Sequence, residues 1–395
     1  MSGAREPLRI VADDAIAFLD EAFGDFGPVV RRPGRAIDRD VLADADVLLV
    51  RSVTRVDAAL LDGTPVRFVG SATAGRDHVD EPSLARAGVT FSAAPGCNAV
   101  AVAEYVLAAL AHVAAARGTP WPASGPVGIV GFGCVGRRLA ARLRALGAQV
   151  LACDPPLASH RVAPHEPDPV LAAQVATEGL RPLQELVDRC DVLSLHVPLI
   201  DDGPHPTRGL LDRDRLARLR DGTTVVNTCR GGVVDDDALA EHLASGRLSA
   251  VLDVWADEPT PRTALVDAAV VATPHVAGYS TPGKRRACAQ VHEALARFVG
   301  RTPWFPAVDP DSSRRPLDPP AREAIGPWLA AAVDLEPAIA ALRELSGTSA
   351  RIDGPRFEAA RRTYRLRQEL SSWALRTPSP DPWWAALGVA RARDR

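Results

Sequence analysis

The chain has 395 residues, of which 47% are hydrophobic and 24% are charged, and its formal net charge is −3. This length predicts two or three domains, and the composition is that of a globular protein with ample apolar residues for its cores. The near-neutral charge disfavours a basic nucleic-acid-binding protein. The six cysteines form no CxxC pair, so reduced thiols are expected rather than a zinc cluster.

Neither secretion nor membrane insertion is indicated. The N-terminus, MSGAREPLRI, lacks the long apolar core of a signal peptide. The longest apolar stretch, residues 99–116, carries Glu104 and His112, which favours a buried helix over a membrane span. We therefore expect a cytoplasmic protein that does not act at a membrane.

The first hundred residues alternate between short apolar runs and helical patterns. Helices are predicted near residues 15–23 and 56–61, and strands are predicted for LRIVA (8–12), DVLLV (46–50) and VRFVG (66–70). This alternation predicts a parallel sheet of βα units. A long helix is predicted after the Pro-Gly turn at residues 95–96.

A second alternating series begins at Val127. Its six strand-like runs are residues 127–133, 148–154, 190–198, 223–230, 248–254 and 269–275. Six such runs with helices between them predict a complete dinucleotide-type sheet. The proline-rich stretch 159–170 is expected to be an irregular loop, and its His160 and His165 lack the partners of a metal site.

The last part of the chain has a different character. Prolines cluster in residues 302–320, which predicts a linker or an irregular lead-in. Helical patterning returns at residues 325–345 and 357–375. This tail is long enough for a small domain.

The strongest local motif is GFGCVG at residues 131–136, between an apolar strand and an amphipathic helix. Gly131 permits a tight turn, Gly133 lets a pyrophosphate approach the backbone, and Gly136 lets helix and strand pack closely. Asp154 ends the next strand at close to the expected spacing of about 20 residues, where an acid binds the ribose hydroxyls. The motif therefore favours NAD over NADP as the cofactor.

Polar side chains follow three further strands of this series. They are Arg230, Asp253 with Glu258, and His275. Carboxyl ends of parallel strands meet at one edge of the sheet, where ligands bind. There an Arg can hold a carboxylate, a His can take the proton of an alcohol, and a Glu can stabilise the protonated imidazole. Each residue alone also has a purely structural explanation, but together they indicate hydride chemistry.

The first series offers a candidate site for an anion. Arg51 and Ser52 follow the run DVLLV, and a basic group beside hydroxyls and backbone amides suits a phosphate. Thr73 offers a hydroxyl and an open backbone for a carboxylate. A solvated loop is the alternative interpretation of this segment.

These motifs resemble, in order, those of the D-isomer-specific 2-hydroxyacid dehydrogenases: GFGCVG, CRGGVVD, DVWADEP and TPHVAG. The resemblance implies that Arg230, Glu258 and His275 are catalytic and that Asp253 contacts the nicotinamide carboxamide. The residues it places against NAD are Gly131, Gly133, Cys134, Val135, Gly136, Asp154, Val197, Asp253 and Gly278.

The resemblance also implies a domain organisation within an α/β fold. A doubly wound Rossmann-type NAD domain (98–280) would be inserted in a flavodoxin-like substrate domain (1–97 and 281–302). A small C-terminal α+β domain (303–395) would mediate homodimerisation. The arginine-rich residues 360–367 would line a subunit contact or, alternatively, reach a neighbour's phosphate.

More narrowly, the chain resembles the branch of this family that oxidises 4-phospho-D-erythronate in vitamin B6 biosynthesis. The segments RSVT (51–54), CDPP (153–156) and AGY (277–279), together with the tail, carry this resemblance. It implies that Ser52, Thr73 and Tyr279 bind the phosphorylated 2-hydroxy acid.

Two features depart from that branch: Val197 stands where its members often carry Thr, and residues 157–179 form a longer stretch than usual. The alternatives are another D-2-hydroxyacid dehydrogenase, such as one acting on 3-phosphoglycerate, and a non-catalytic NAD-sensing interaction protein.

Overall fold

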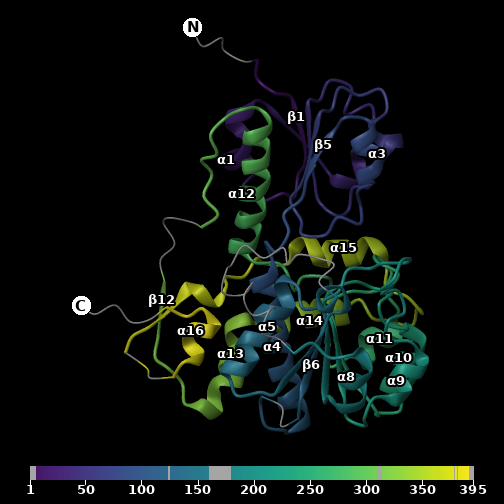
Figure 1. Ribbon diagram of the computed structural model, residues 1–395, viewed down its shortest axis with the longest axis vertical. Coiled ribbons are helices and arrows are strands. Elements are labelled where there is room, and N and C mark those ends of the chain that lie inside the picture. Colours follow the sequence, from purple (N-terminus) through teal and green to yellow (C-terminus); the bar gives the residue numbers. More distant parts are fainter. Residues whose placement is uncertain are drawn as a thin grey trace. The chain divides into compact units, whose positions relative to one another are not determined.

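The computed structural model describes residues 6–122, 125–159, 179–308, 314–377, 379 and 381–390. The chain forms two compact units (Figure 1). Unit 1 comprises residues 1–98 and 280–312, and unit 2 comprises residues 99–279 and 313–395. Each unit is built on its own parallel sheet, which confirms the predicted α/β fold. The tail is grouped with unit 2, and its role as a separate dimerisation domain stays a prediction.

Unit 1 has a five-stranded parallel sheet in the order β2-β1-β3-β4-β5, the flavodoxin-like order. Its strands are β1 (Ile10–Asp13), β2 (Val29–Arg32), β3 (Val47–Val50), β4 (Phe68–Ser71) and β5 (Thr90–Ser92). The three strands predicted from the sequence are the central ones. The two edge strands were not predicted, because β5 has three residues and β2 is largely exposed and ends in two arginines.

The helices of unit 1 come from both ends of its sequence. They are α1 (Leu19–Phe23), α2 (Ala58–Leu61), α3 (Glu81–Arg86) and α12 (Thr281–Phe298), with 3-10 turns η1 (Gly24–Phe26) and η2 (Gly34–Ala36). Helix α12 packs against α1 and β4. A Cβ at Gly70 of β4 would lie 2.5 Å from the Val291 side chain, so glycine is what lets α12 approach the sheet.

Unit 2 has a six-stranded parallel sheet in the order β11-β10-β9-β8-β6-β7. Its strands are β6 (Val127–Val130), β7 (Val150–Cys153), β8 (Val192–Leu195), β9 (Thr224–Asn227), β10 (Ser249–Leu252) and β11 (Val271–Ala272). All six predicted strands are confirmed. The chain runs from β6 outward to β7 and returns to β8 on the other side of β6, so the topological switch point lies between β6 and β8.

Helices flank this sheet along the chain. They are α4 (Ala99–Arg117), α5 (Cys134–Ala145), α6 (Pro155–Ala158), α8 (Leu183–Arg189), α9 (Arg213–Arg218), α10 (Asp236–Ala244) and α11 (Thr263–Ala268). Among the described residues, α4 is long and apolar enough to cross a membrane, but 78% of its apolar window is buried inside the protein, as predicted for a core helix. Two tail helices pass the same test only as one strongly bent pair.

The tail packs onto the nucleotide-type sheet domain of unit 2. Its elements are β12 (Arg315–Leu317), η3 (Arg322–Ala324), α13 (Ile325–Val333), α14 (Glu336–Arg343), α15 (Gly354–Thr363), η4 (Leu370–Ser372), β13 (Trp373–Leu375) and α16 (Trp383–Leu387). Helix α13 packs on α4, α16 on α5 and α14 beside β11, while β12 and β13 pair in parallel.

The second tail helix predicted from the sequence, residues 357–375, is wrong beyond Thr363. Tyr364 takes an extended conformation (φ −58°, ψ 123°) that ends α15. The chain then anchors to Glu104 of α4, whose carboxylate accepts hydrogen bonds from the Arg367 guanidinium (2.9 Å) and the Leu370 amide (3.0 Å). These tertiary bonds replace the helical hydrogen bonds that local propensity alone would favour.

Candidate active site

The glycine loop connects β6 to α5 and has the geometry its motif predicts. Gly131 has φ +93°, and a Cβ there would lie 2.4 Å from the His196 carbonyl oxygen. A Cβ at Gly136 would lie 2.1 Å from the Gly131 carbonyl oxygen. At Gly133, in contrast, a Cβ would meet no atom within 4 Å. Gly131 and Gly136 therefore serve the protein's own packing, and Gly133 keeps space open at the start of α5.

Asp154 stands at the end of β7, beside this loop. Its Oδ2 accepts a hydrogen bond from the Phe132 amide (2.8 Å), and its Oδ1 caps α6 by accepting from the Leu157 amide (3.1 Å). Both oxygens keep a second lone pair for another donor. The acid therefore has the position that a ribose-binding residue needs, next to the glycine loop and with remaining acceptor capacity.

On the other side of the switch point, β8 leads to His196 and Val197. His196 accepts or donates one hydrogen bond with the Ser194 hydroxyl (2.9 Å), and burial lowers the pKa of this histidine to about 3. His196 is therefore neutral and structural. The apolar side chain of Val197 lies beside Gly131. A Cβ at Gly131 would be 3.0 Å from it.

Arg230 lies in the loop after β9. Its Nη1 donates to the Cys229 carbonyl (2.7 Å), and its own carbonyl accepts from the Asn227 side chain (2.9 Å). The next residue, Gly231, passes so close to the loop after β10 that a Cβ would lie 2.0 Å from the Trp255 carbonyl oxygen. Glycine at this position therefore lets the arginine loop and the glutamate loop pack together.

Glu258 and His275 form the central pair of the site. His275 Nδ1 lies 2.8 Å from Glu258 Oε2, and Glu258 Oε1 accepts from the Trp255 amide (3.1 Å). Both side chains are about one-quarter exposed. Burial alone would raise the pKa of Glu258, but His275, Arg361 and the Trp255 amide together lower it below its usual value. Glu258 is therefore ionised at neutral pH and faces the imidazole.

Asp253 holds the loop that carries His275. Its buried carboxylate accepts from the Thr273 hydroxyl (2.6 Å) and from the amides of Val276 (2.7 Å) and Ala277 (2.9 Å). Burial raises the pKa of Asp253 to about 6. The three bonds fix the loop in which His275 adopts a left-handed conformation (φ 59°).

Gly278 and Tyr279 continue this loop, and Tyr279 is partly exposed. The Tyr279 ring lies edge-on to that of Tyr364 (centroids 6.2 Å apart), and the Arg361 guanidinium lies over it at 5.7 Å. Both partners come from the tail. No local pattern pointed to this contact, because it depends on tertiary packing between segments about 80 residues apart.

The predicted substrate residues of unit 1 lie at the carboxyl ends of neighbouring strands. Arg51 and Ser52 follow β3, and Thr73 follows β4, which pairs with β3 in parallel. Arg51 Nε forms a 3.0 Å salt bridge with Asp13, which is fully buried. Thr73 Oγ1 lies 2.8 Å from the Ser71 hydroxyl. Asp13 was not singled out from the sequence, although an acid directly after a predicted strand is a usable signal.

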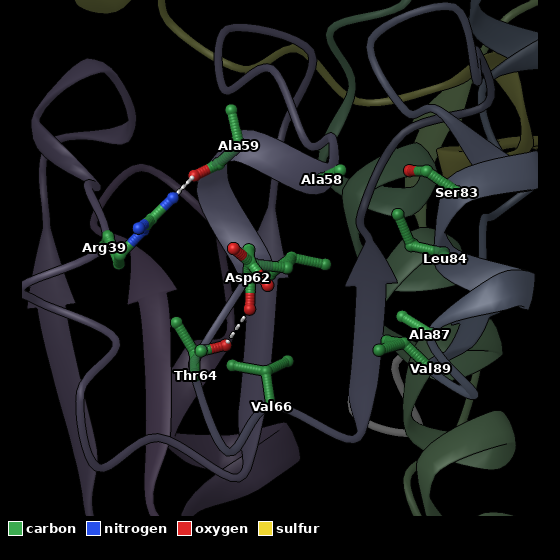
Figure 2. Close-up of a pocket in the computed structure, with 12 residues that line it drawn as sticks. Arg39, Ala58, Ala59, Asp62, Thr64, Val66, Ser83, Leu84, Ala87 and Val89 are labelled. Atoms are coloured by element: carbon green, nitrogen blue, oxygen red, sulfur yellow. Dashed lines mark hydrogen bonds between the residues drawn. The ribbon is translucent and has the colours of Figure 1, made fainter.

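A cavity of about 490 Å³ lies elsewhere in unit 1, against α2 and α3 (Figure 2). Arg39 donates to the Ala59 carbonyl (2.7 Å) beside it. Among the described residues that line it, Arg51, Ser52 and Thr73 do not occur, so it is distinct from the predicted substrate residues.

Of the predicted residues, the structure therefore brings together Arg230, Glu258 and His275 with the glycine loop at one edge of the unit 2 sheet. Cys134 and Val135 open α5 at the same edge. His160 and His165, and nearly all of the 157–179 stretch, lie outside the described residues. Within the described ranges, no group of three or more His, Cys, Asp or Glu side chains is placed to hold a metal ion.

Comparisons with known proteins identify the family of this chain. Residues 116–277 match the family model "D-isomer specific 2-hydroxyacid dehydrogenase, NAD binding domain". An erythronate-4-phosphate dehydrogenase of Pseudomonas fluorescens is 47% identical over 78% of this chain and 80% of its own length. The erythronate-4-phosphate dehydrogenase of Escherichia coli O157:H7 is 42% identical over 92% of this chain and 93% of its own.

Solved structures resemble this chain over about three-quarters of its length. A Thermus thermophilus protein aligns with a TM-score of 0.61 and 28% identity, covering 76% of this chain and all of its own. A D-lactate dehydrogenase of Aquifex aeolicus, solved with NAD and lactic acid, aligns with a TM-score of 0.59 and 21% identity over 74% of this chain and 96% of its own. With these matches, the chain belongs to the D-isomer-specific 2-hydroxyacid dehydrogenase family, among the erythronate-4-phosphate dehydrogenases.

Proposed function

We propose that the protein is an NAD-dependent dehydrogenase that oxidises 4-phospho-D-erythronate at C2, giving 3-hydroxy-2-oxo-4-phosphobutanoate for vitamin B6 biosynthesis. One observation carries the chemical part of the proposal: the Glu258–His275 pair lies at the same sheet edge as the glycine loop. The relatives named above support the choice of substrate, because they match over most of both chains.

His275 is proposed to take the proton of the C2 hydroxyl. Its Nδ1 faces the Glu258 carboxylate at 2.8 Å, and a carboxylate only accepts hydrogen bonds. Nδ1 therefore carries the proton of the neutral imidazole, and Nε2 has the free lone pair that a general base needs. When Nε2 becomes protonated, the charge of Glu258 stabilises the imidazolium.

Arg230 is proposed to hold the substrate carboxylate. A guanidinium binds a carboxylate through two parallel hydrogen bonds, which fixes the orientation of C2. Two contacts restrain the position of Arg230. Its Nη1 donates to the Cys229 carbonyl, and the next residue, Gly231, packs closely against the loop after β10. Bound NAD supplies the acceptor for the C2 hydride.

The loop fits NAD in its open space at Gly133 and in the amide groups at the start of α5. We propose that Gly131 to Gly136, including Cys134 and Val135, hold the pyrophosphate and that Asp154 binds the ribose. Val197 and Gly278 are proposed to line the remaining cofactor surface. Asp253 keeps acceptor capacity for a nicotinamide carboxamide, and its three bonds also make it a positioning residue for the His275 loop.

Arg51, Ser52, Thr73 and Tyr279 are proposed to bind the substrate beyond C2. In unit 1, buried Asp13 orients the Arg51 side chain through its Nε. Homodimerisation is proposed to use the tail, as the family resemblance implies. Light scattering on purified protein tests this, and a monomer at micromolar concentration would contradict it.

A substrate panel tests the function. Purified protein is given NAD and 4-phospho-D-erythronate, 3-phosphoglycerate or D-lactate, and NADH formation is followed, with a 2-keto acid added in a parallel run. Selective turnover of 4-phospho-D-erythronate is expected, and turnover seen only with the keto acid indicates retained NADH. Selective turnover of 3-phosphoglycerate would replace the substrate. Folded, NAD-binding protein without turnover on any of them would favour a sensor.

A further inference from the structure

Arg361 of helix α15 is a buried cation whose Nε has no hydrogen-bond partner among the described residues. The residue is 9% exposed, and its Nε is fully buried. Within the same described ranges it forms no salt bridge. Its guanidinium lies over the Tyr279 ring at 5.7 Å, and its charge lowers the pKa of Glu258.

A buried guanidinium with an unpaired donor lowers the stability of the fold unless a ligand supplies the missing acceptor. A guanidinium has five N–H donors, and burying one of them without an acceptor is destabilising. The aromatic ring of Tyr279 compensates only in part, because a cation–π contact favours the charge but does not accept the Nε–H hydrogen bond. Glu258 acts on the guanidinium only through its charge, because the two side chains form no salt bridge within the described ranges. The nearby acidic groups, Glu258 foremost among the carboxylates, favour the charged form and raise the pKa of Arg361, but its buried Nε still has no acceptor among the described residues.

We infer that Arg361 binds the phosphate group of the substrate and makes the enzyme selective for a phosphorylated 2-hydroxy acid. The inference rests on the proposed function and adds to it a residue from the tail. A phosphate offers oxygen acceptors of the kind that the buried Nε lacks, and Arg binds phosphates through two hydrogen bonds. Tyr279, on which the guanidinium lies, is itself proposed to touch the substrate.

The local packing holds the guanidinium in place for this role. Phe357, one turn earlier on α15, is fully buried, and Tyr364 packs edge-on against Tyr279 just after the helix ends. Arg367 then ties the segment to Glu104. A pre-positioned side chain loses less entropy when its ligand binds, so Arg361 is suited to discriminate between substrates.

The test compares three variants with the wild type. Arg361→Met removes the charge, Arg361→Lys keeps it without the two-pronged geometry, and Arg356→Met, at an exposed position of the same helix outside residues 360–367, is the control. We measure kcat and KM on 4-phospho-D-erythronate and on unphosphorylated D-erythronate. The binding of inorganic phosphate to the protein with NAD is measured by calorimetry, and folding is checked by thermal unfolding.

For Arg361→Met we expect kcat/KM on the phosphorylated substrate to fall by about 10- to 150-fold, the range for a hydrogen bond to a charged group. The kcat/KM on D-erythronate should change by less than about threefold. The affinity for inorganic phosphate should fall by about the same factor as the ratio of the two kcat/KM values. The values for Arg361→Lys should lie between those of Arg361→Met and the wild type, and Arg356→Met should match the wild type.

Three results would overturn the inference. One is unchanged selectivity and phosphate affinity in folded Arg361→Met. Another is an equal loss on both substrates with a displaced pH profile, because Arg361 would then act only through Glu258. If Arg361→Met does not fold, wild-type selectivity and phosphate affinity in Arg361→Lys would count equally against it. A wild type without turnover on any substrate would refute the proposed function instead, while calorimetry still tests Arg361.

Discussion

Replacing Glu258 with glutamine isolates the charge that faces His275. In the wild type, Glu258 Oε1 accepts from the Trp255 amide and Oε2 faces Nδ1 of the imidazole. A glutamine must keep its carbonyl oxygen on the Trp255 amide, because an amide donor needs an acceptor. Its NH₂ group then points at Nδ1 and donates to it. The imidazole proton moves to Nε2, which is the wrong tautomer for a general base.

The size of the effect follows from these two contacts. A hydrogen bond to a charged group contributes about 1.5–3 kcal/mol, which is equal to roughly 10- to 150-fold in kcat/KM. The wrong tautomer adds to this loss, and a general base contributes about 10²- to 10⁴-fold in all. We expect Glu258→Gln to lower kcat/KM on 4-phospho-D-erythronate by about 10²- to 10⁴-fold.

The pH profile separates this explanation from simple disruption. The pKa of Glu258 is below its usual value, so its charge is present at neutral pH and favours the protonated imidazole. Without that carboxylate, the part of the acidic fall in kcat/KM that comes from protonation of Glu258 is absent from the variant, so its acidic limb changes. Glu241→Gln, which breaks the exposed pair with Arg213, should leave rate and profile unchanged. A Glu258→Gln enzyme with wild-type kcat/KM and an unmoved acidic limb would refute the reasoning.

Three further predictions concern single residues. His275→Ala should lower turnover by about 10²- to 10⁴-fold with NAD binding intact, and near-normal turnover would remove it from the mechanism. Asp154→Ala should narrow the preference for NAD over NADP, measured as the ratio of kcat/KM values, and an unchanged ratio would contradict its ribose role. Burial raises the pKa of Glu104 from 4.5 to about 7, so the stability contributed by its protonated form is full below pH 4.5 and is lost as the pH rises through 7. The unfolding free energy of the wild type, relative to that of Glu104→Gln, should therefore fall by up to about 3 kcal/mol between pH 4.5 and pH 7. The Tm of the wild type minus that of the variant should fall over the same range. A Tm difference that does not change with pH would contradict this.

The strands of the unit 2 sheet and the residues at its carboxyl edge could be predicted, because both depend on short patterns of neighbouring residues. The six strands are apolar runs bounded by breakers, and a parallel sheet places the residues after each strand at one edge. Arg230, Glu258 and His275 were found in this way. The glycine loop was found from its GxGxxG pattern, in which Gly131 and Gly136 avoid steric clashes and Gly133 leaves space open.

The parts that escaped prediction depend on contacts distant in sequence. Strand β2 is an exposed edge without an apolar pattern. The end of α15 is set by Arg367 and Leu370 bonding to Glu104, more than 250 residues away. Arg361 reaches Tyr279 for the same reason, through the packing of the tail. Helical periodicity says only that such residues share a face, not which surface that face meets.

The most direct test of the central claim uses 4-phospho-D-erythronate with deuterium at C2. The account predicts that one deuterium per turnover is recovered in the reduced nicotinamide, that the product is the 2-oxo acid by mass spectrometry, and that His275→Ala suppresses both together. Deuterium that stays in the product or appears in water would contradict oxidation at C2 by hydride transfer.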